Sequence, residues 1–234
     1  MKRDLLERLV AAQESNRPSV LGRNLSGKQQ FLLHDHTDVA AADDIPPQIL
    51  QAAMTALARD GARTVEAAGQ RYLLQSLSPP PRLLIIGAVH IAQALIPMAR
   101  VAGYDIQLVD PRTAFATPGR FPGIEIINGW PQEVMTKLPL NSRTAVVTLS
   151  HDAKIDEPAL KAALESSAFY IGALGSKRNH AKRLARLAVF GFDDKALARI
   201  SGPVGLPLGG RSPAEIAVAI LAQIIQSRYQ ADVS

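Results

Sequence analysis

Short apolar runs alternate with amphipathic stretches through the last two-thirds of this 234-residue chain. Short runs of mainly apolar residues predict buried strands, and apolar positions at helical spacing between them predict helices. Such alternation is typical of an α/β protein, in which a parallel sheet carries helices on both faces. The predicted strands are 82–86, 105–109, 124–127, 144–149 and 168–171, and the predicted helices between them are 90–101, 131–138 and 157–165.

Prolines mark two of the helix ends. We expect Pro97 to kink the helix 90–101 or to end it early, because proline has no backbone N–H to donate. A last helix is predicted to begin at Ser212-Pro213-Ala214-Glu215, a capping box with proline at the first helical position. Apolar residues of this helix are expected to form one buried stripe: Ile216, Ala217, Ile220, Ile224 and Ile225.

The first 80 residues have a different pattern, which predicts a small α+β domain. Helices are predicted at 3–12 and 47–59, an apolar stretch at 31–33, and a hairpin about Gly69-Gln70. Ser78-Pro79-Pro80-Pro81 follows, and consecutive prolines hold an extended path. We therefore expect two domains, an N-terminal one of residues 1–80 and a larger one of residues 81–234.

The apolar run 83–86 turns at Gly87 into a predicted helix, and Asp110 closes the next apolar run. A glycine turn followed by an acid at this distance is typical of a Rossmann nucleotide site, where the acid binds ribose. Asp110 and Pro111 could equally form a plain turn, and Arg112 could bind an anion or be solvated. Val89 replaces the middle glycine, so we hypothesise that Val89→Gly would raise dinucleotide affinity in a titration.

A second glycine turn indicates an anion site. Gly172 and Gly175 allow close backbone approach, and Ser176, Lys177 and Arg178 begin a helix whose N-terminus offers free N–H groups. We expect this turn to bind phosphate. The basic residues that follow are more typical of a solvated helix face than of a second site: His180, Lys182, Arg183 and Arg186.

Polar side chains also follow the strand 144–149. His151 and Asp152 could act as acid and base or hold a ligand, whereas Asp152 could instead cap the next helix. His90, at the start of the first helix, is a further ligand-contact candidate. The segment His34-Asp35-His36 could bind a metal on a strand face, but without a third ligand it is more typical of a surface, and we predict no metal site.

The amino-acid composition of the chain favours some classes of ligand and partner and excludes others. The net charge of +5 favours anionic ligands, but aromatic residues make up only 5%, so a nucleic-acid partner is not indicated. The chain has no cysteine, which fits a reducing compartment and excludes sulfur chemistry on its own thiols. The charged N-terminus is unlike a signal peptide and no apolar run is long enough to span a membrane, so we expect a cytoplasmic protein.

Five motifs, taken in order, resemble the XdhC/CoxI family, accessory proteins for molybdenum hydroxylases such as xanthine dehydrogenase. The resemblance spans about residues 80–229. The chain departs from the family at Val89, where glycine is usual, and in a short N-terminal region without a cysteine- and glycine-rich stretch. The motifs are Ile86-Gly87-Ala88-x-His90, Val109-Asp110-Pro111-Arg112, Ser150-His151-Asp152, Tyr170-Ile171-Gly172-Ala173-Leu174-Gly175-Ser176-Lys177-Arg178 and Ser212-Pro213-x-Glu215.

The resemblance implies a non-catalytic, chaperone-like maturation factor that binds molybdenum cofactor, a pterin with a phosphate, before insertion into its client. The glycine turns with Lys177 and Arg178 would hold the phosphate, while His90, His151 and Asp152 would line the cleft. Implied partners are a molybdenum hydroxylase client, a cysteine desulfurase and a second copy of the chain. An NAD(P)-dependent oxidoreductase that uses His151 as acid and base is the alternative.

Overall fold

The computed structural model describes residues 3–15, 17–34, 44–57, 61–138 and 140–230. Within it the chain divides into two compact units, Met1–Pro79 and Pro80–Ser234, and each is described by itself. Two expectations concern residues outside these ranges. Asp35 and His36 of the possible metal site are not described, nor are the last residues of the helix predicted at 47–59.

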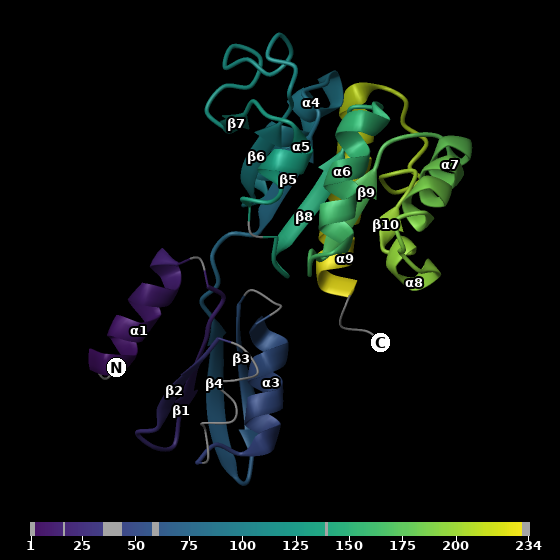
Figure 1. Ribbon diagram of the computed structural model, residues 1–234. Coiled ribbons are helices and arrows are strands. Elements are labelled where there is room, and N and C mark those ends of the chain that lie inside the picture. The colour runs from purple at the N-terminus through teal and green to yellow at the C-terminus, as the bar shows by residue number, and fades with distance from the viewer. Residues whose placement is uncertain (1–2, 16, 35–43, 58–60, 139, 231–234) are drawn as a thin grey trace. The chain divides into compact units, whose positions relative to one another are not determined.

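The described part of the first unit is a four-stranded antiparallel sheet with a helix on each face (Figure 1). The strands β1 (Val20–Asn24), β2 (Gln30–Leu33), β3 (Ala62–Ala67) and β4 (Gln70–Ser76) lie in the order β2-β1-β4-β3. The predicted hairpin is β3–β4, whose register pairs Ala67 with Gln70. Helix α3 (Pro47–Leu57) packs on one face through Ile49 and Ala53, and α1 (Arg3–Glu14) contacts the other through Leu5 and Leu9.

The second unit confirms the predicted α/β class. Its described strands form a six-stranded parallel sheet in the order β10-β9-β8-β5-β6-β7. The order reverses at β5, and ligands of open parallel sheets bind at the carboxyl edge beside such a reversal. The strands are β5 (Arg82–Ile86), β6 (Asp105–Val109), β7 (Glu125–Ile127), β8 (Thr144–Thr148), β9 (Tyr170–Ala173) and β10 (Ile200–Ser201).

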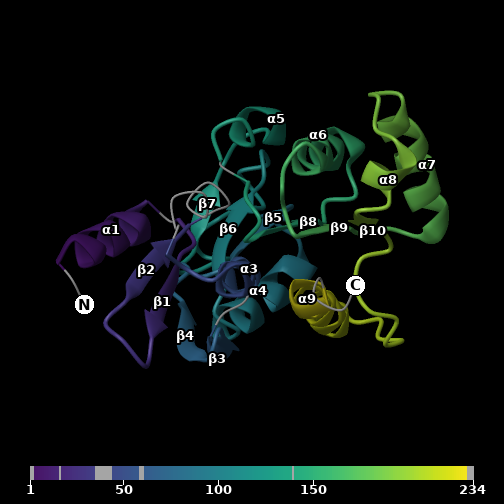
Figure 2. The same ribbon diagram turned by 90° about the horizontal axis from the view of Figure 1, so that it is seen from below.

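Helices cover both faces of this sheet, as Figure 2 shows. Helices α4 (His90–Val101) and α9 (Pro213–Gln230) pack together on one face, where Leu95 and Ile220 are fully buried. Helices α5 (Pro131–Val134) and α6 (Ala153–Leu164) lie on the other, with α7 (Lys177–Ala188) and α8 (Asp194–Leu197) beyond α6. Two apolar cores therefore sandwich the sheet and fix the ends of its strands.

Two helices differ from their predicted bounds, and a third has its predicted bounds and continues past the proline that was expected to kink it or end it early. Helix α4 does not end at Pro97 but continues to Val101, because Ile96 and Ala99 are buried on either side of the exposed proline. Helix α5 ends at Val134, short of the predicted 138. Helix α6 begins at Ala153, four residues before the predicted start, because an N-cap precedes it.

The capping box of α9 is confirmed. Ser212 Oγ accepts the Glu215 N–H at 3.2 Å, and Glu215 Oε2 accepts the Ser212 N–H at 2.9 Å. The predicted stripe is right for Ala217, Ile220 and Ile224, but Ile225 is exposed. Among the residues that the structure describes, no helix combines the length and the apolar composition needed to cross a membrane.

Candidate functional site at the carboxyl edge of the parallel sheet

The turn after β5 lies directly against the loop after β8. Gly87 has a φ of +111°, which glycine adopts without the cost that a side chain would add. A Cβ atom there would stand 2.8 Å from the Ser150 backbone nitrogen. Gly87 is therefore required twice, for its backbone conformation and for the approach of the two loops.

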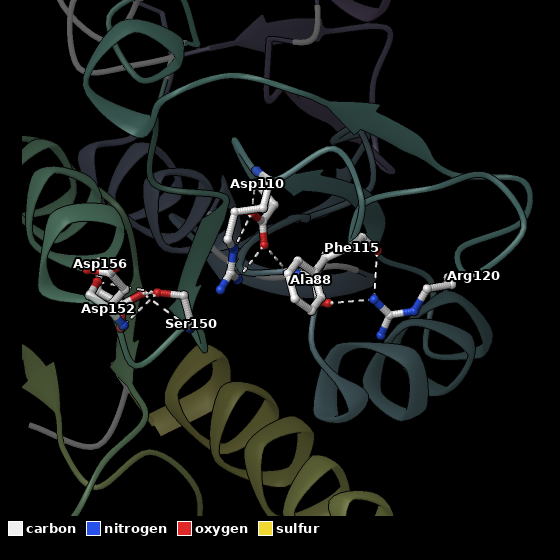
Figure 3. Close-up of polar contacts among 8 residues, drawn as sticks. Ala88, Asp110, Phe115, Arg120, Ser150, Asp152 and Asp156 are labelled. Carbon is white, nitrogen blue, oxygen red and sulfur yellow. Dashed lines mark hydrogen bonds and ion pairs between the residues drawn. The ribbon is translucent and has the colours of Figure 1, made fainter.

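Asp110, at the end of β6, joins the same turn. Its carboxylate is fully buried, and Oδ2 accepts the Ala88 N–H at 2.7 Å (Figure 3). The Arg112 guanidinium binds both oxygens, with Nε 2.9 Å from Oδ1 and Nη2 2.7 Å from Oδ2. Burial acts to raise the pKa of Asp110, but hydrogen bonds from Arg112 and Ala88 outweigh it and lower the pKa. The carboxylate is already bound on both oxygens, so a ribose hydroxyl would have to displace Arg112.

The loop after β6, at the top of Figure 1, is held over the glycine turn by cations. Arg120 Nη1 donates to the Phe115 carbonyl at 2.8 Å and to the Ala88 carbonyl at 3.3 Å (Figure 3). The Arg112 guanidinium lies 4.9 Å from the centre of the Phe115 ring, which is 47% exposed. The loop therefore presents an aromatic ring beside a partly exposed guanidinium at this edge.

Val89 and His90 lie where the sequence places them, at the start of α4. Val89 occupies the N-cap position with an extended backbone, and its side chain packs partly buried against the core. His90 is the first helical residue and is exposed. The valine side chain therefore contributes to packing, while the imidazole is free to contact a ligand.

A buried carboxylic acid supports the loop after β8. Ser150 Oγ donates to Asp156 Oδ1 at 2.6 Å, and the Ser150 N–H donates to the same oxygen at 3.3 Å (Figure 3). Asp156 is fully buried on α6, and within the described residues its Oδ2 has no hydrogen-bond partner. Burial raises the pKa of Asp156, against the opposing effects of Ser150, Arg183 and His151.

The structure gives the two predicted residues of this loop different positions. Asp152 is the N-cap of α6 and accepts the Lys154 N–H at 2.9 Å, which is the capping role that the sequence left open. His151 is exposed, with a φ of +63° that few residues other than glycine adopt. Asp156, rather than Asp152, is the buried acid at this point.

The turn between β9 and α7 also reaches this edge. Gly172 is buried in β9, where a Cβ would stand 2.6 Å from Val204 Cγ2, so its small size serves packing. Ser176 caps α7 by accepting the Asn179 N–H at 3.2 Å. Lys177 and Arg178 are exposed on the first turn of α7.

A pocket of about 130 Å³ lies between this turn and the loop after β8. His151, Gly175 and Lys182 contribute to its wall, and Arg183 forms its buried part. Arg183 is only 6% exposed, so the expected solvated helix face is wrong for this residue. The complete lining is His151, Ala153, Glu157, Leu174, Gly175, Asn179, Lys182, Arg183 and Arg186.

Asp156 and Arg183 are the residues that sequence reasoning missed. Each follows the start of its helix by several residues, and each is surrounded by charged neighbours typical of a solvent-facing surface. One signal was available, since a helical projection places Arg183 on the same face as Leu187. Among the described residues, no three histidine or acidic side chains gather as metal ligands would.

These features define a Rossmann-type α/β domain with a polar site at the carboxyl edge of its sheet. Residues 83–224 match the family described as the XdhC Rossmann domain. The chain belongs to this family, and the resemblance inferred from its motifs is confirmed.

One relative has a name that refers to xanthine dehydrogenase, and another has a name that refers to molybdenum cofactor. The chain is 30% identical over 156 residues to a Bacillus subtilis protein whose name describes a probable subunit of xanthine dehydrogenase. It is 32% identical over 150 residues to the Escherichia coli "Molybdenum cofactor insertion chaperone PaoD". These matches cover 66% and 64% of the chain but only 45% and 41% of the relatives, so the chain matches less than half of their length.

A solved structure supports the fold. A crystal structure described as a xanthine dehydrogenase from Bacillus halodurans superposes with a TM-score of 0.68 at 24% sequence identity. The match covers 98% of this chain and 66% of that one. At this identity the likeness shows the fold alone, and the Rossmann-like class with an N-terminal α+β appendage is confirmed.

Proposed function

We propose that this chain is a maturation factor for a molybdenum hydroxylase of the xanthine dehydrogenase type, which binds molybdenum cofactor and assists its delivery or insertion. One observation carries the proposal. In a chain of the XdhC Rossmann family, the turn at Gly87, the loop at His151 and the turn at Gly175 gather at one edge of the sheet. The name of PaoD, which describes cofactor insertion, supports the same role.

The residues present at this edge fit a pterin with a phosphate. Donors and small residues are needed at the pterin, and positive charge at the phosphate. His151 and Asp152 would lie between two groups of contacts. On the side of β5 and β6 the proposed contacts are Gly87, Val89, His90 and Arg112, and on the side of β9 they are Gly175, Ser176, Lys177 and Arg178. Asp110 and Gly172, which the sequence also predicted as contacts, are buried and support the two turns from within.

In this function the chain binds and orients its cargo rather than reacting with it. The exposed ring of Phe115, beside Arg112, offers a flat apolar surface to a planar heterocycle. No cysteine is present, so sulfuration of a bound cofactor would need another enzyme, for which a cysteine desulfurase is the proposed partner. The hydroxylase client and a homodimer are proposed partners as well.

Native mass spectrometry tests cofactor binding directly. The chain is incubated with molybdenum cofactor released from a molybdoenzyme, with NAD(H) and NADP(H) as competitors. We expect the pterin to be retained and not displaced. Selective retention of a nicotinamide dinucleotide would contradict the proposal and favour the oxidoreductase.

Delivery needs a second readout. A cofactor-free hydroxylase is mixed with released cofactor, with and without the chain, and the recovery of hydroxylase activity is followed. We expect the chain to increase the rate or yield of recovery. Recovery that is the same without the chain, or with an unrelated protein of similar charge, would refute a role in insertion.

A further inference from the structure

A buried guanidinium without a full set of partners faces the pocket between α6 and α7. Arg183 Nη2 donates to the Leu174 carbonyl at 2.8 Å, but Nη1 has no hydrogen-bond partner among the described residues. Buried charged groups are normally paired, and an exception calls for an explanation such as a missing ligand. Helices α6 and α7 lie next to each other in Figures 1 and 2. The pocket is lined by the start of α6, at Ala153 and Glu157, and by α7 from Asn179 to Arg186.

The charge in the pocket is mainly positive. Lys182 and Arg186 line it with Arg183, and the acid in the lining, Glu157, is bound by Arg186 Nε at 2.6 Å. Asp156 contributes to the electrostatics of Arg183 but is not among the described residues that line the pocket. An anion that enters would therefore meet more positive than negative charge.

Gly175 borders the guanidinium in the pocket wall. A Cβ atom there would stand 3.7 Å from Arg183 Nη2 and 3.7 Å from Asn179 Cβ, which are ordinary van der Waals distances, and the φ of +149° favours glycine. The pocket, at about 130 Å³, is smaller than the roughly 300–1,000 Å³ of sites that enclose a drug-sized ligand. It can enclose a phosphate group, with the remainder of a ligand left outside.

We infer that this pocket binds a phosphate monoester, with Arg183 as the buried anchor and Lys182 and Arg186 at the mouth. A guanidinium offers a planar pair of donors that suits phosphate oxygens. This inference rests on the proposed function for its occupant, the phosphate of the pterin. It assigns the phosphate to the body of α7, rather than to Lys177 and Arg178 on its first turn.

Binding of inorganic phosphate to the full chain tests the pocket itself. Calorimetric titration in phosphate-free buffer compares the wild type with Lys182→Ala/Arg186→Ala and, separately, with Arg183→Lys. We expect the dissociation constant for phosphate to rise at least about tenfold in both variants. Lys182→Ala/Arg186→Ala loses the positive charge at the mouth, and Arg183→Lys loses the paired donors of the guanidinium. The matched control, Lys137→Ala/Lys195→Ala, removes two exposed lysines outside the pocket and should stay within about twofold.

Two results would overturn the assignment. One is a wild type that does not bind phosphate, and the other is a Lys182→Ala/Arg186→Ala variant that binds like its control. Circular dichroism checks that each variant is folded, and the double variant changes only exposed residues, so it remains informative if Arg183→Lys unfolds.

Competition identifies the source of the phosphate. Molybdopterin released from a molybdoenzyme should displace inorganic phosphate from the wild type, whereas displacement by AMP and not by the pterin would refute the pterin as occupant. The insertion assay separates the two proposals. If phosphate binds but insertion is not stimulated, the proposed function is refuted and the pocket assignment stands. If wild type and Lys182→Ala/Arg186→Ala stimulate insertion equally, the pocket assignment is refuted and the proposed function stands.

Discussion

Asp110 Oδ2 lies 2.7 Å from the backbone nitrogen of Ala88, so the end of β6 is tied to the turn that follows β5. The same oxygen accepts a hydrogen bond from Arg112, whose side chain is 34% exposed. An acid at this position is expected to bind ribose in a Rossmann site. Here the carboxylate orders the turn instead, and the guanidinium is the group that faces solvent.

Asp110→Asn should destabilise the second unit. The charged acceptor of four hydrogen bonds is lost, and the expected decrease in the free energy of unfolding at pH 7 is about 2 kcal/mol. Urea unfolding can be followed by the fluorescence of Trp130, the only tryptophan, which lies in this unit. The control is Asp105→Asn, an exposed acid 4.0 Å from Arg82, for which we expect less than about 0.5 kcal/mol.

The contribution of Asp110 to the free energy of unfolding should also depend on pH. Its pKa in the folded protein is lowered, so its contribution is complete above the ordinary carboxyl pKa of about 4 and is lost as the pH falls through the folded value. The stability difference between wild type and Asp110→Asn should therefore shrink on acidification below about pH 4. A difference that stays constant down to acid unfolding would show that the carboxylate charge is not responsible.

Gly87→Ala should be more damaging than other glycine substitutions at positive φ. The methyl group meets the Ser150 backbone at 2.8 Å in addition to the cost of the conformation, which is about 1–3 kcal/mol. Gly191, with a φ of +92° and nothing within 4 Å of an added Cβ, is the matched control. We expect Gly87→Ala to lower the unfolding midpoint clearly more than Gly191→Ala, and equal shifts would show that the two loops do not touch.

Asp156→Asn tests the buried acid. The raised pKa of Asp156 means that the folded protein holds its proton more tightly, so stability falls as the pH rises from about 4 towards the folded value. An amide keeps the acceptor for Ser150 without that cost. We expect the variant to be within about 1 kcal/mol of wild type at pH 7 and to lack this pH dependence.

The opposite result would show that Asp156 and Arg183 form a required ion pair. Breaking a buried pair typically costs about 3–5 kcal/mol. Arg183 would then be the counter-ion of Asp156, and Asp156→Asn would unfold at a much lower urea concentration. Asp156→Ala, which also removes the acceptor for Ser150 Oγ, serves as the destabilised reference.

Lys177→Ala/Arg178→Ala should weaken phosphate binding only modestly. Both side chains are exposed and, unlike Lys182 and Arg186, neither lines the pocket. Their charges would act on the phosphate only from outside, and salt screens exposed charges beyond a Debye length of about 8 Å at physiological ionic strength. We expect a loss of about two- to threefold in low salt that disappears at higher salt, measured by the same calorimetry. A large loss that persists in salt would place the phosphate on the first turn of α7.

Much of the framework was predictable from local pattern. The buried residues 83–86 of β5 are all apolar, the capping box at Ser212 and Glu215 marks a helix start, and Gly87 marks a turn. Each of these signals comes from a few neighbouring residues and from backbone chemistry that does not depend on the rest of the chain. The family resemblance depended on the same local motifs.

The sequence by itself therefore determined the α/β class and most of the strands and helices of the second unit, but it predicted neither α8 nor β10. Only the tertiary structure decided which polar groups are buried at the carboxyl edge of the sheet. Arg112 binds Asp110, Asp152 caps α6, and Asp156 and Arg183 lie inside, because burial depends on the neighbouring helix and not on a residue's own segment. A charged residue on a polar helix looks solvated in sequence, and only the packing of α6 beside α7 turns Arg183 into the wall of a pocket.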